Sequence, residues 1–519
     1  MDTLHDSKRR LAISKLKIVL SSALSLSLIT LLSGCGGNRI ESEAPPQTIP
    51  GLNAQGFARD ANGFFPNEYG IYPDANGKFL DFNSAGLFFN PSGVARSYST
   101  AGPINTDHPF FKNFGNGRTC ATCHVQAEAF TVTPTGLQMR FEQSNGTDPI
   151  FRTVDGSNSP LAPVATLEQR RSAYSMLLKR GVIRIGMPVP ANAEFELVGV
   201  DDPYHFASAR ELSLFRRILP AANLKFLGSV MWDNRESAID PSSNECIRAI
   251  SICFALLDAN LLRQANGATR GHAQAARDLT PDELRQIVDF EKTLVVAQEL
   301  DYSALALSSA NAKGGTATLL KTDYYFDIND LFADPRTGLP GRKEAIQLYG
   351  NWANQSTNTR VGAARQSIAR GEVLFNTKAF DIVNTLGVND VFGPLVKGTC
   401  SFCHNVPQVG GFSLPVAFDI GVADAANRTP DMPLYTLRNK STGALQTTQD
   451  PGQAMQTGRW SDIGRFKSPG LRGLAARPPY FHDGSAQTIE QVMVFYETRF
   501  KIGLSAQETA DMVAFMKSL

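Results

Sequence analysis

Two short motifs of identical spacing, Cys-Ala-Thr-Cys-His at 120–124 and Cys-Ser-Phe-Cys-His at 400–404, are the residues of this chain best suited to chemistry. Two cysteines three residues apart can form thioethers with both vinyl groups of one haem, and the histidine that follows can bind the iron. Zinc would need further Cys or His ligands at suitable spacing, and a thioredoxin-like motif is not expected twice. The motifs therefore predict two covalently bound haem c groups, held by Cys120, Cys123, His124, Cys400, Cys403 and His404, with His124 and His404 as metal ligands.

The second axial position of each iron separates electron transfer from catalysis. A protein ligand closes the iron, whereas an open position admits peroxide or oxygen. Near the first motif, His108 and Met139 are the candidate ligands for haem 1. Because most methionines and most lone histidines are structural, neither of them is assigned as a ligand from the sequence.

Two helical patterns, one downstream of each motif, are expected to complete the domains that hold the haems. TPDELRQIVDFEKTL begins at Thr280, and SAQETADMVAFMKSL begins at Ser505. Each opens with a capping box, Thr280 with Glu283 and Ser505 with Glu508, and then places apolar residues at matching helical positions. The segments that precede these helices also correspond to each other, since Pro220 to Asn234 resembles Pro469 to Gly484. These paired features occur in the same order and predict an internal duplication.

Helical patterns and loops rich in Gly and Pro dominate the rest of the chain, and strand patterns are scarce. We therefore expect a mainly α fold, in which two cytochrome c-like haem domains related by duplication carry long loops and insertions. The first domain, with haem 1, is assigned to residues 99–300. Residues 301–519 are assigned to an interdomain insertion, over about 301–364, and to the second domain, with haem 2.

The N-terminus has the composition of an export signal. A basic segment precedes the apolar run Ile18 to Leu32, which is too short for a comfortable membrane span. Leu-Ser-Gly-Cys at 32–35 resembles a lipobox, which implies a lipoprotein signal peptide over 1–34 and a lipid anchor on Cys35. Residues 35–98 are expected to form a tether and an irregular extension. Gly36, in place of Asp, favours the periplasmic face of the outer membrane over the inner membrane, with the periplasm as the alternative.

The overall charge indicates no nucleic-acid partner. The 519 residues contain 50 Lys and Arg and 49 Asp and Glu, which gives a net charge of +1. Cys246 and Cys253 are the cysteines outside the two motifs and Cys35. On one regular helix they would lie about 10.5 Å apart, so a disulfide between them requires a break in the helix.

The segment KSPGLRGLAARPPYFHDGSAQTIEQVMVFY, from Lys467 to Tyr496, is similar to the signature of the bacterial dihaem cytochrome c peroxidase and MauG superfamily. The first haem motif and VMWDNRE at Val230 resemble the first haem site and the FWDGR segment of that superfamily. The resemblance covers most of residues 99–519. It implies an oxidoreductase that reduces hydrogen peroxide, or activates oxygen, at a peroxidatic haem 1. Electrons would pass through haem 2 from a donor such as a small cytochrome or a cupredoxin. The alternative is a pure electron-transfer protein with both irons closed.

The resemblance also implies roles for single residues. Trp232 corresponds to a tryptophan that relays electrons between the haems. Tyr496 corresponds to the second ligand of haem 2, which is Tyr in MauG-type enzymes and Met in the peroxidases, and Met493 is the competing candidate. Gln264 and His272 lie at positions comparable to those of the acid–base residues, and an imidazole can move a proton between peroxide oxygens.

Two departures from the superfamily pattern bear on these roles. Asn234 replaces the Gly that follows Trp-Asp, and no distal His has a clear counterpart after His124, which favours an open haem 1. The Asn and Thr positions associated with an interdomain calcium ion are not recognisable, so calcium as a further cofactor is in doubt.

Overall fold

The computed structural model describes residues 86–237, 257–325, 327–329 and 344–519. The expected signal peptide, the lipid-anchored Cys35 and the Cys246–Cys253 pair lie outside these ranges. Across the described ranges, no helix is both long enough and apolar enough to cross a membrane.

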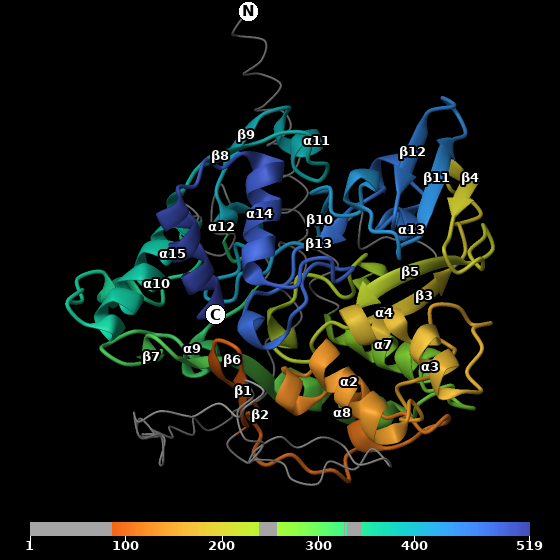
Figure 1. Cartoon of the computed structure of the whole chain (residues 1–519), viewed down its shortest axis with the longest axis horizontal. Coiled ribbons are helices and arrows are strands. Elements are labelled where there is room, and N and C mark those ends of the chain that lie inside the picture. The colour runs from red at the N-terminus through yellow and green to blue at the C-terminus, as the bar shows by residue number, and fades with distance from the viewer. Residues whose placement is uncertain (1–85, 238–256, 326, 330–343) are drawn as a thin grey trace, which may run out of the picture. The chain divides into compact units, whose positions relative to one another are not determined.

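In Figure 1 most helices of the first half of the chain lie together in the lower right, and α10, α12, α14 and α15 of the second half lie together on the left. In the first half, α8 packs against α7, and in the second half α15 packs against α10 and α14. The helices are α2 (Pro134–Ser144), α3 (Leu167–Ala173), α4 (Ser175–Arg180), α7 (Leu257–Gly271), α8 (Pro281–Thr293), α9 (Ala317–Lys321), α10 (Arg360–Thr377), α11 (Asn389–Phe392), α12 (Cys400–Cys403), α13 (Ala454–Thr457), α14 (Ile489–Phe500) and α15 (Ala506–Lys517). The first motif begins with the short 3₁₀ helix Cys120–Thr122.

Both helices expected from the paired sequences are present and begin at the expected caps. The Thr280 hydroxyl accepts the N–H of Glu283 at the start of α8, and the Ser505 hydroxyl accepts the N–H of Glu508 at the start of α15. Satisfying these otherwise unpaired amides fixes where each helix starts. The faces with matching apolar positions are buried, including Ile287 of α8.

The strand content is higher than the mainly α expectation, which is therefore supported only in part. A four-stranded sheet has the order β1-β2-β6-β7, and a three-stranded sheet has the order β12-β11-β4. The strands are β1 (Leu87–Asn90), β2 (Gly93–Ser99), β3 (Val182–Met187), β4 (Phe195–Asp201), β5 (Leu212–Arg217), β6 (Leu294–Asp301), β7 (Leu305–Ala306), β8 (Phe380–Ile382), β9 (Val396–Gly398), β10 (Ala417–Phe418), β11 (Leu434–Asn439), β12 (Leu445–Thr448) and β13 (Phe466–Lys467). Most of them are short, and β4 pairs with β11 across more than two hundred residues of sequence, so local patterns do not reveal them.

The end of the N-terminal extension is not irregular as expected. Residues 87–99 form an antiparallel hairpin of β1 and β2, and β2 also pairs with β6. The interdomain insertion likewise joins a core, because Tyr349 and Trp352 are fully buried among residues of α10 and α15. The Tyr349 hydroxyl donates to the Ser518 carbonyl at 2.8 Å. Both segments therefore pack into hydrophobic cores of the described chain.

The two paired loops have the same backbone shape. Met231 and Phe481 occupy matching positions and both have φ of 66°. Asn234 and Gly484 also match, with φ of 61° and 66°. This left-handed region is uncommon for residues other than glycine, although Asn tolerates it. The repeated conformation supports the duplication, and it explains how Asn234 can replace the Gly of the superfamily pattern.

Candidate functional site

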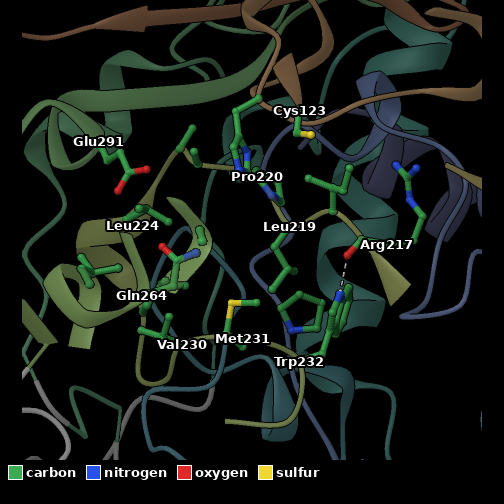
Figure 2. Close-up of a pocket in the computed structure, with 18 of the residues that line it drawn as sticks. Cys123, Arg217, Leu219, Pro220, Leu224, Val230, Met231, Trp232, Gln264 and Glu291 are labelled. Carbon is green, nitrogen blue, oxygen red and sulfur yellow. Dashed lines mark hydrogen bonds between the residues drawn. The ribbon is translucent and has the colours of Figure 1, made fainter. Parts of the chain in front are cut away.

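The first haem motif lies in the wall of a cavity, here called cavity 1. Side chains from the motif, from β5 and the loop after it, and from α7 and α8 surround this space (Figure 2). Its lining includes Cys120, Cys123, His124, Arg217, Leu219, Pro220, Leu224, Met231, Trp232, Gln264, His272 and Glu291. The surface of the cavity is mostly apolar, as a haem requires.

The second haem motif lies in the wall of another cavity, here called cavity 2. Helices α10, α14 and α15 contribute apolar side chains to it. Its lining includes Cys400, Cys403, His404, Phe375, Phe466, His482, Met493, Tyr496, Met512 and Met516. The lining contains no Asp or Glu among the described residues.

Both motif histidines are oriented in the same way. His124 Nδ1 lies 3.0 Å from the Phe130 carbonyl oxygen, and His404 Nδ1 contacts the Gly410 carbonyl oxygen, in each case six residues further on. An Nδ1–H that donates to a carbonyl leaves Nε2 with a free lone pair. Burial lowers the pKa of each imidazole to about 4, which favours the neutral, metal-binding form. Each histidine is thus prepared to bind an iron through Nε2.

The four motif cysteines are unpaired thiols, and burial raises the pKa of each of them. Within the described ranges, no three His, Cys, Asp or Glu side chains gather as a metal site. A zinc cage around either motif would need such a group. The combination of two thiols, one oriented imidazole and an apolar cavity fits haem c, and these residues would hold one haem in each cavity.

Trp232 stands in a wall that the two cavities share. Its indole N–H donates to the Arg217 carbonyl at 2.8 Å (Figure 2), and its ring centroid lies 6.4 Å from that of His482. The residues that border both cavities are Arg217, Ile218, Leu219, Pro220, Trp232, Lys467, Ser468, Pro469 and Arg477. Trp232 therefore lies between the two cavities, and its expected role between two haems stays a prediction.

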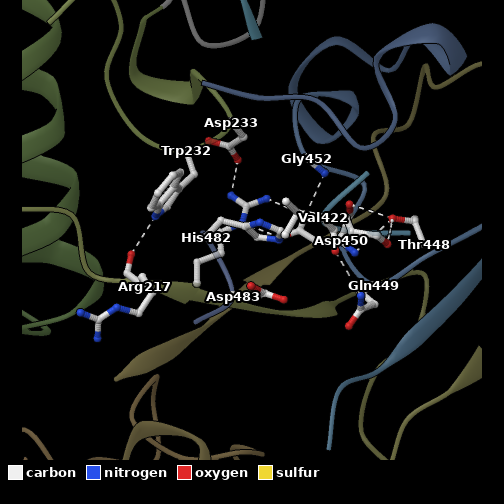
Figure 3. A network of polar contacts seen from close by, with 12 residues as sticks. Arg217, Trp232, Asp233, Val422, Thr448, Gln449, Asp450, Gly452, His482 and Asp483 are labelled. Carbon is white, nitrogen blue, oxygen red and sulfur yellow. Dashed lines mark hydrogen bonds and ion pairs between the residues drawn. The ribbon is translucent and has the colours of Figure 1, made fainter. Parts of the chain in front are cut away.

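A buried network of ion pairs next to Trp232 holds the wall between the two cavities in place (Figure 3). Arg216 donates to Asp233 at 2.5 Å and to Asp450 at 2.7 Å, and all three side chains are almost fully buried. Despite its burial, Asp233 has its pKa lowered to about 2, because Arg216 and Arg235 stabilise the carboxylate. Asp233 follows Trp232 directly and Asp450 belongs to the second half, so the network ties the two halves together beside the indole.

The two acid–base candidates, Gln264 and His272, both line cavity 1. His272 Nδ1 lies 2.5 Å from Asp155, whose other oxygen binds Arg118 at 2.6 Å. This pairing orients the imidazole and leaves its Nε2 available. The Gln264 amide has no hydrogen-bond partner among the described residues, and Figure 2 shows it beside the cavity.

Sequence reasoning missed two other groups that border cavity 1. Glu291 is 6% exposed, its Oε2 has no hydrogen-bond partner among the described residues, and burial raises its pKa to about 8. In the paired helix, Met516 occupies the corresponding position and lines cavity 2. A carboxyl at the position where the paired helix has a thioether was the sequence feature that could have identified Glu291. Met231, beside Trp232, contributes a thioether to the lining of cavity 1.

The two sequence-near candidates for the second ligand of haem 1 do not line cavity 1. His108 Nδ1 accepts the N–H of Phe110 at 3.2 Å, so the imidazole caps the 3₁₀ helix Pro109–Phe111. Met139 lies on α2 and is not among the residues that border the cavity. The structure gives both of them structural positions.

Both candidates for the second ligand of haem 2 line cavity 2 from α14. Met493 is 3% exposed. The Tyr496 hydroxyl has no hydrogen-bond partner among the described residues, and burial together with the Cys403 and Cys400 thiols raises its pKa. Since one helical turn separates the two side chains, the geometry leaves either able to reach the same iron.

Comparisons with known proteins agree with the resemblance drawn from the sequence. A stretch of 139 residues is 30% identical to the cytochrome-c peroxidase IdrP1 of Denitromonas iodatirespirans and covers 24% of this chain and 37% of that protein. A stretch of 142 residues is 34% identical to the cytochrome c551 peroxidase of Nitrosomonas europaea and covers 26% of this chain and 35% of that protein. The chain thus spans little more than a third of the length of these relatives. No protein-family model matches it.

Among solved structures, a MauG-like protein associated with microbial copper homeostasis is 14% identical, with 79% of this chain and 87% of that chain covered. The TM-score of 0.33 is too low for this match to support an argument about the fold. The sequence matches to cytochrome c peroxidases agree with the resemblance to the cytochrome c peroxidase and MauG superfamily.

Proposed function

From its similarity to bacterial dihaem cytochrome c peroxidases, we propose that this chain is a dihaem c-type oxidoreductase that reduces hydrogen peroxide, or activates oxygen, in cavity 1. The observation that carries the proposal is the shared wall: each cavity holds one haem motif with an oriented histidine, and Trp232 lies between them. An iron in cavity 1 would bind and activate the oxidant, and electrons would reach it from cavity 2.

Trp232 is the proposed relay between the two cavities. Its ring borders both of them, and its indole N–H is anchored on the Arg217 carbonyl. The Arg216–Asp233 ion pair holds the adjacent residue, so the indole has little freedom to turn. A fixed aromatic ring between two redox groups shortens each transfer step.

His272 is the proposed proton carrier of cavity 1. Asp155 binds its Nδ1 and leaves Nε2 to take a proton from bound peroxide and return it to the other oxygen. The Gln264 amide can donate to the same oxygens, since the protein gives it no other partner among the described residues. These two side chains would orient the oxidant and move its proton.

In cavity 2, Tyr496 is the proposed second ligand of haem 2, with Met493 as the alternative. A phenolate is harder and more basic than a thioether and therefore lowers the reduction potential of the haem. The electron donor would be a small cytochrome or a cupredoxin. Calcium is not part of the proposal. Export to the periplasm, with a lipid anchor on Cys35, completes the proposal and rests on the N-terminal sequence alone.

A second candidate function is a pure electron carrier. The Met231 thioether borders cavity 1 and would close an iron there if it were a ligand. The optical spectrum of the oxidised holoprotein separates the two functions. A high-spin component that shifts when peroxide is added, together with peroxide-dependent oxidation of a reduced small cytochrome, supports the enzyme. Two wholly low-spin haems, with one becoming high-spin in Met231→Leu, would refute the enzyme and support the carrier.

A further inference from the structure

The buried cations of this protein fall into two classes. Nine Arg and Lys side chains are buried in the described ranges. Six of them form an ion pair with Asp or Glu, namely Arg118, Arg140, Arg180, Arg184, Arg216 and Arg465. The other three, Arg217, Lys467 and Arg472, form none with the described residues, and all three border cavity 1. Since a buried charge without an ion pair is strongly unfavourable, this distribution favours a partner that the described side chains do not supply at ion-pair distance. Of the described carboxylates, only the more distant charges of Glu299 and Glu128 stabilise Arg472 and Arg217, respectively.

Arg217 is largely satisfied by the backbone. Its Nη1 donates to the Gly181 carbonyl at 3.0 Å, and its Nη2 donates to the Val132 carbonyl at 2.9 Å. Because backbone carbonyls already accept from its guanidinium, Arg217 does not need a further anionic partner. Lys467 and Arg472 differ from it in this respect.

The segment from Lys467 to Arg477 supplies three cations with incomplete partners. Arg472 Nη2 contacts the Gly315 carbonyl, but its Nε and Nη1 have no hydrogen-bond partner among the described residues. Arg477 Nη2 donates to the Gly470 carbonyl, and its Nε is likewise without a partner. Lys467 Nζ donates to the Ser229 carbonyl at 3.2 Å. Arg472 borders cavity 1, whereas Lys467 and Arg477 border both cavities.

The electrostatics of these groups agree with a missing anion. Burial lowers the pKa of Lys467 to about 8 and that of Arg477 to about 10, and the positive charge of Arg477 adds to the lowering at Lys467. Neither cation forms an ion pair with an acid among the described residues. Arg216 provides the contrast, since its two carboxylates raise its pKa although it is equally buried. In the cavity walls, Asp155 is already paired with Arg118, and Glu291 carries a carboxyl that burial keeps neutral.

We propose that Lys467, Arg472 and Arg477 are the counter-ions of the haem propionates, with Arg472 serving haem 1 and the other two serving either haem across the shared wall. A haem brings two carboxylates into a site that is otherwise apolar. Carboxylates pair well with guanidinium groups, which present parallel N–H donors. The inference rests on the dihaem assignment of the proposed function, but not on peroxide turnover.

A cation beside a haem stabilises the ferrous state relative to the ferric state, because reduction removes one positive charge from the iron. Removing that cation should therefore lower the midpoint potential. It should also let the released propionate take up a proton on reduction, which makes the potential depend on pH. Both changes can be measured without any catalytic turnover.

The test uses the purified holoprotein and optical redox titration of each haem between about pH 5 and 8. Arg472→Leu should lower the potential of haem 1 and make it depend on pH, and Arg472→Lys should restore most of the original value. The neutral variant Arg472→Gln keeps a donor and should still lower the potential, which covers the case in which the Leu variant does not fold. Arg477→Leu should shift the potential of at least one haem in the same direction.

Arg365→Leu is the matched control. Arg365 also has no acidic partner in the part of the chain that the structure describes, but it packs on Trp352 with its guanidinium 5.0 Å from the ring and borders neither cavity. Its removal should leave both potentials unchanged. Unaltered potentials in the Arg472 and Arg477 variants would overturn the proposal, and so would a wild-type protein whose mass shows no covalent haem. Two attached haems without peroxide turnover would refute the proposed enzyme and leave the counter-ion assignment intact.

Discussion

Replacing Asp233 by Asn tests whether the ionic network behind Trp232 stabilises the interhaem wall. The Asp233 carboxylate accepts from Arg216 at 2.5 Å and from Arg235 at 3.2 Å, and it is fully buried. The substitution keeps the size of the side chain and removes its charge. Arg216 then keeps only Asp450 as an acidic partner, at 2.7 Å. The loop that carries the indole should therefore loosen without losing its core contacts.

The magnitude follows from the pKa of Asp233, which folding lowers from 3.8 to about 2. At 1.36 kcal/mol per pKa unit, the charged form contributes about 2 kcal/mol to the free energy of unfolding. A lowered pKa means that this contribution is fully present above about pH 4 and is lost as the pH falls through about 2. Asp233→Asn should therefore cost about 2 kcal/mol at pH 7 and much less near pH 2.

The assay is urea unfolding of the holoprotein at several pH values, combined with the rate of electron transfer between the haems. Asp148→Asn is the control, because Arg140 and Asp148 form a buried pair at 2.5 Å that borders neither cavity. Both variants should lose stability, but only Asp233→Asn should slow the interhaem transfer. If Asp233→Asn leaves the stability at pH 7 unchanged, or if both variants slow the transfer equally, the reasoning about this wall is wrong.

The remaining predictions concern single side chains in the two cavities. Trp232→Phe should preserve both haem spectra and slow interhaem electron transfer, whereas an unchanged rate would remove the indole from the path. Tyr496→Phe should change the spectrum and potential of haem 2 while Met493→Leu does little, and the reverse result would make Met493 the ligand. His272→Ala should lower kcat for peroxide at least about tenfold while both haems stay attached, and retention of full kcat would exclude a proton-carrying role. Between about pH 4.5 and 8, folded Glu291 keeps a proton that the unfolded chain releases, so the free energy of unfolding falls as the pH rises. In Glu291→Gln this fall should be less steep, and equal slopes in both proteins would show that Glu291 does not titrate there.

The parts of this protein that the sequence predicts are those encoded over a few residues. A haem motif, a capping box at Thr280 and an amphipathic helix depend on near neighbours, and the structure has the helix where the pattern indicates it. Met231 and Phe481 have the same φ, so the weak similarity between the two paired segments correctly indicated a shared backbone conformation. Gln264 and His272 were identified by their place after Trp232 in the superfamily pattern, and both border cavity 1.

The parts that sequence reasoning missed depend on contacts between distant segments. Arg216 and Asp450 are more than two hundred residues apart, and nothing local to either one indicates the ion pair between them. The short strands β4 and β11 pair over a similar distance. Glu291 appears in the sequence as one polar residue near the end of a helix, and only the packing of α8 shows that it is buried at a cavity.

The shared wall explains why both halves of the chain are needed for either cavity to be complete. Cavity 1 takes Lys467, Arg472 and Arg477 from the second half, and cavity 2 takes Arg217 and Trp232 from the first. If the cations of the second half neutralise propionates in cavity 1, filling one cavity removes an electrostatic penalty that the other also experiences. Loading of one haem should then reduce the electrostatic gain from loading the other, since both haems would pair with the same buried cations. The wall would thus couple the two cavities through charge as well as through the tryptophan.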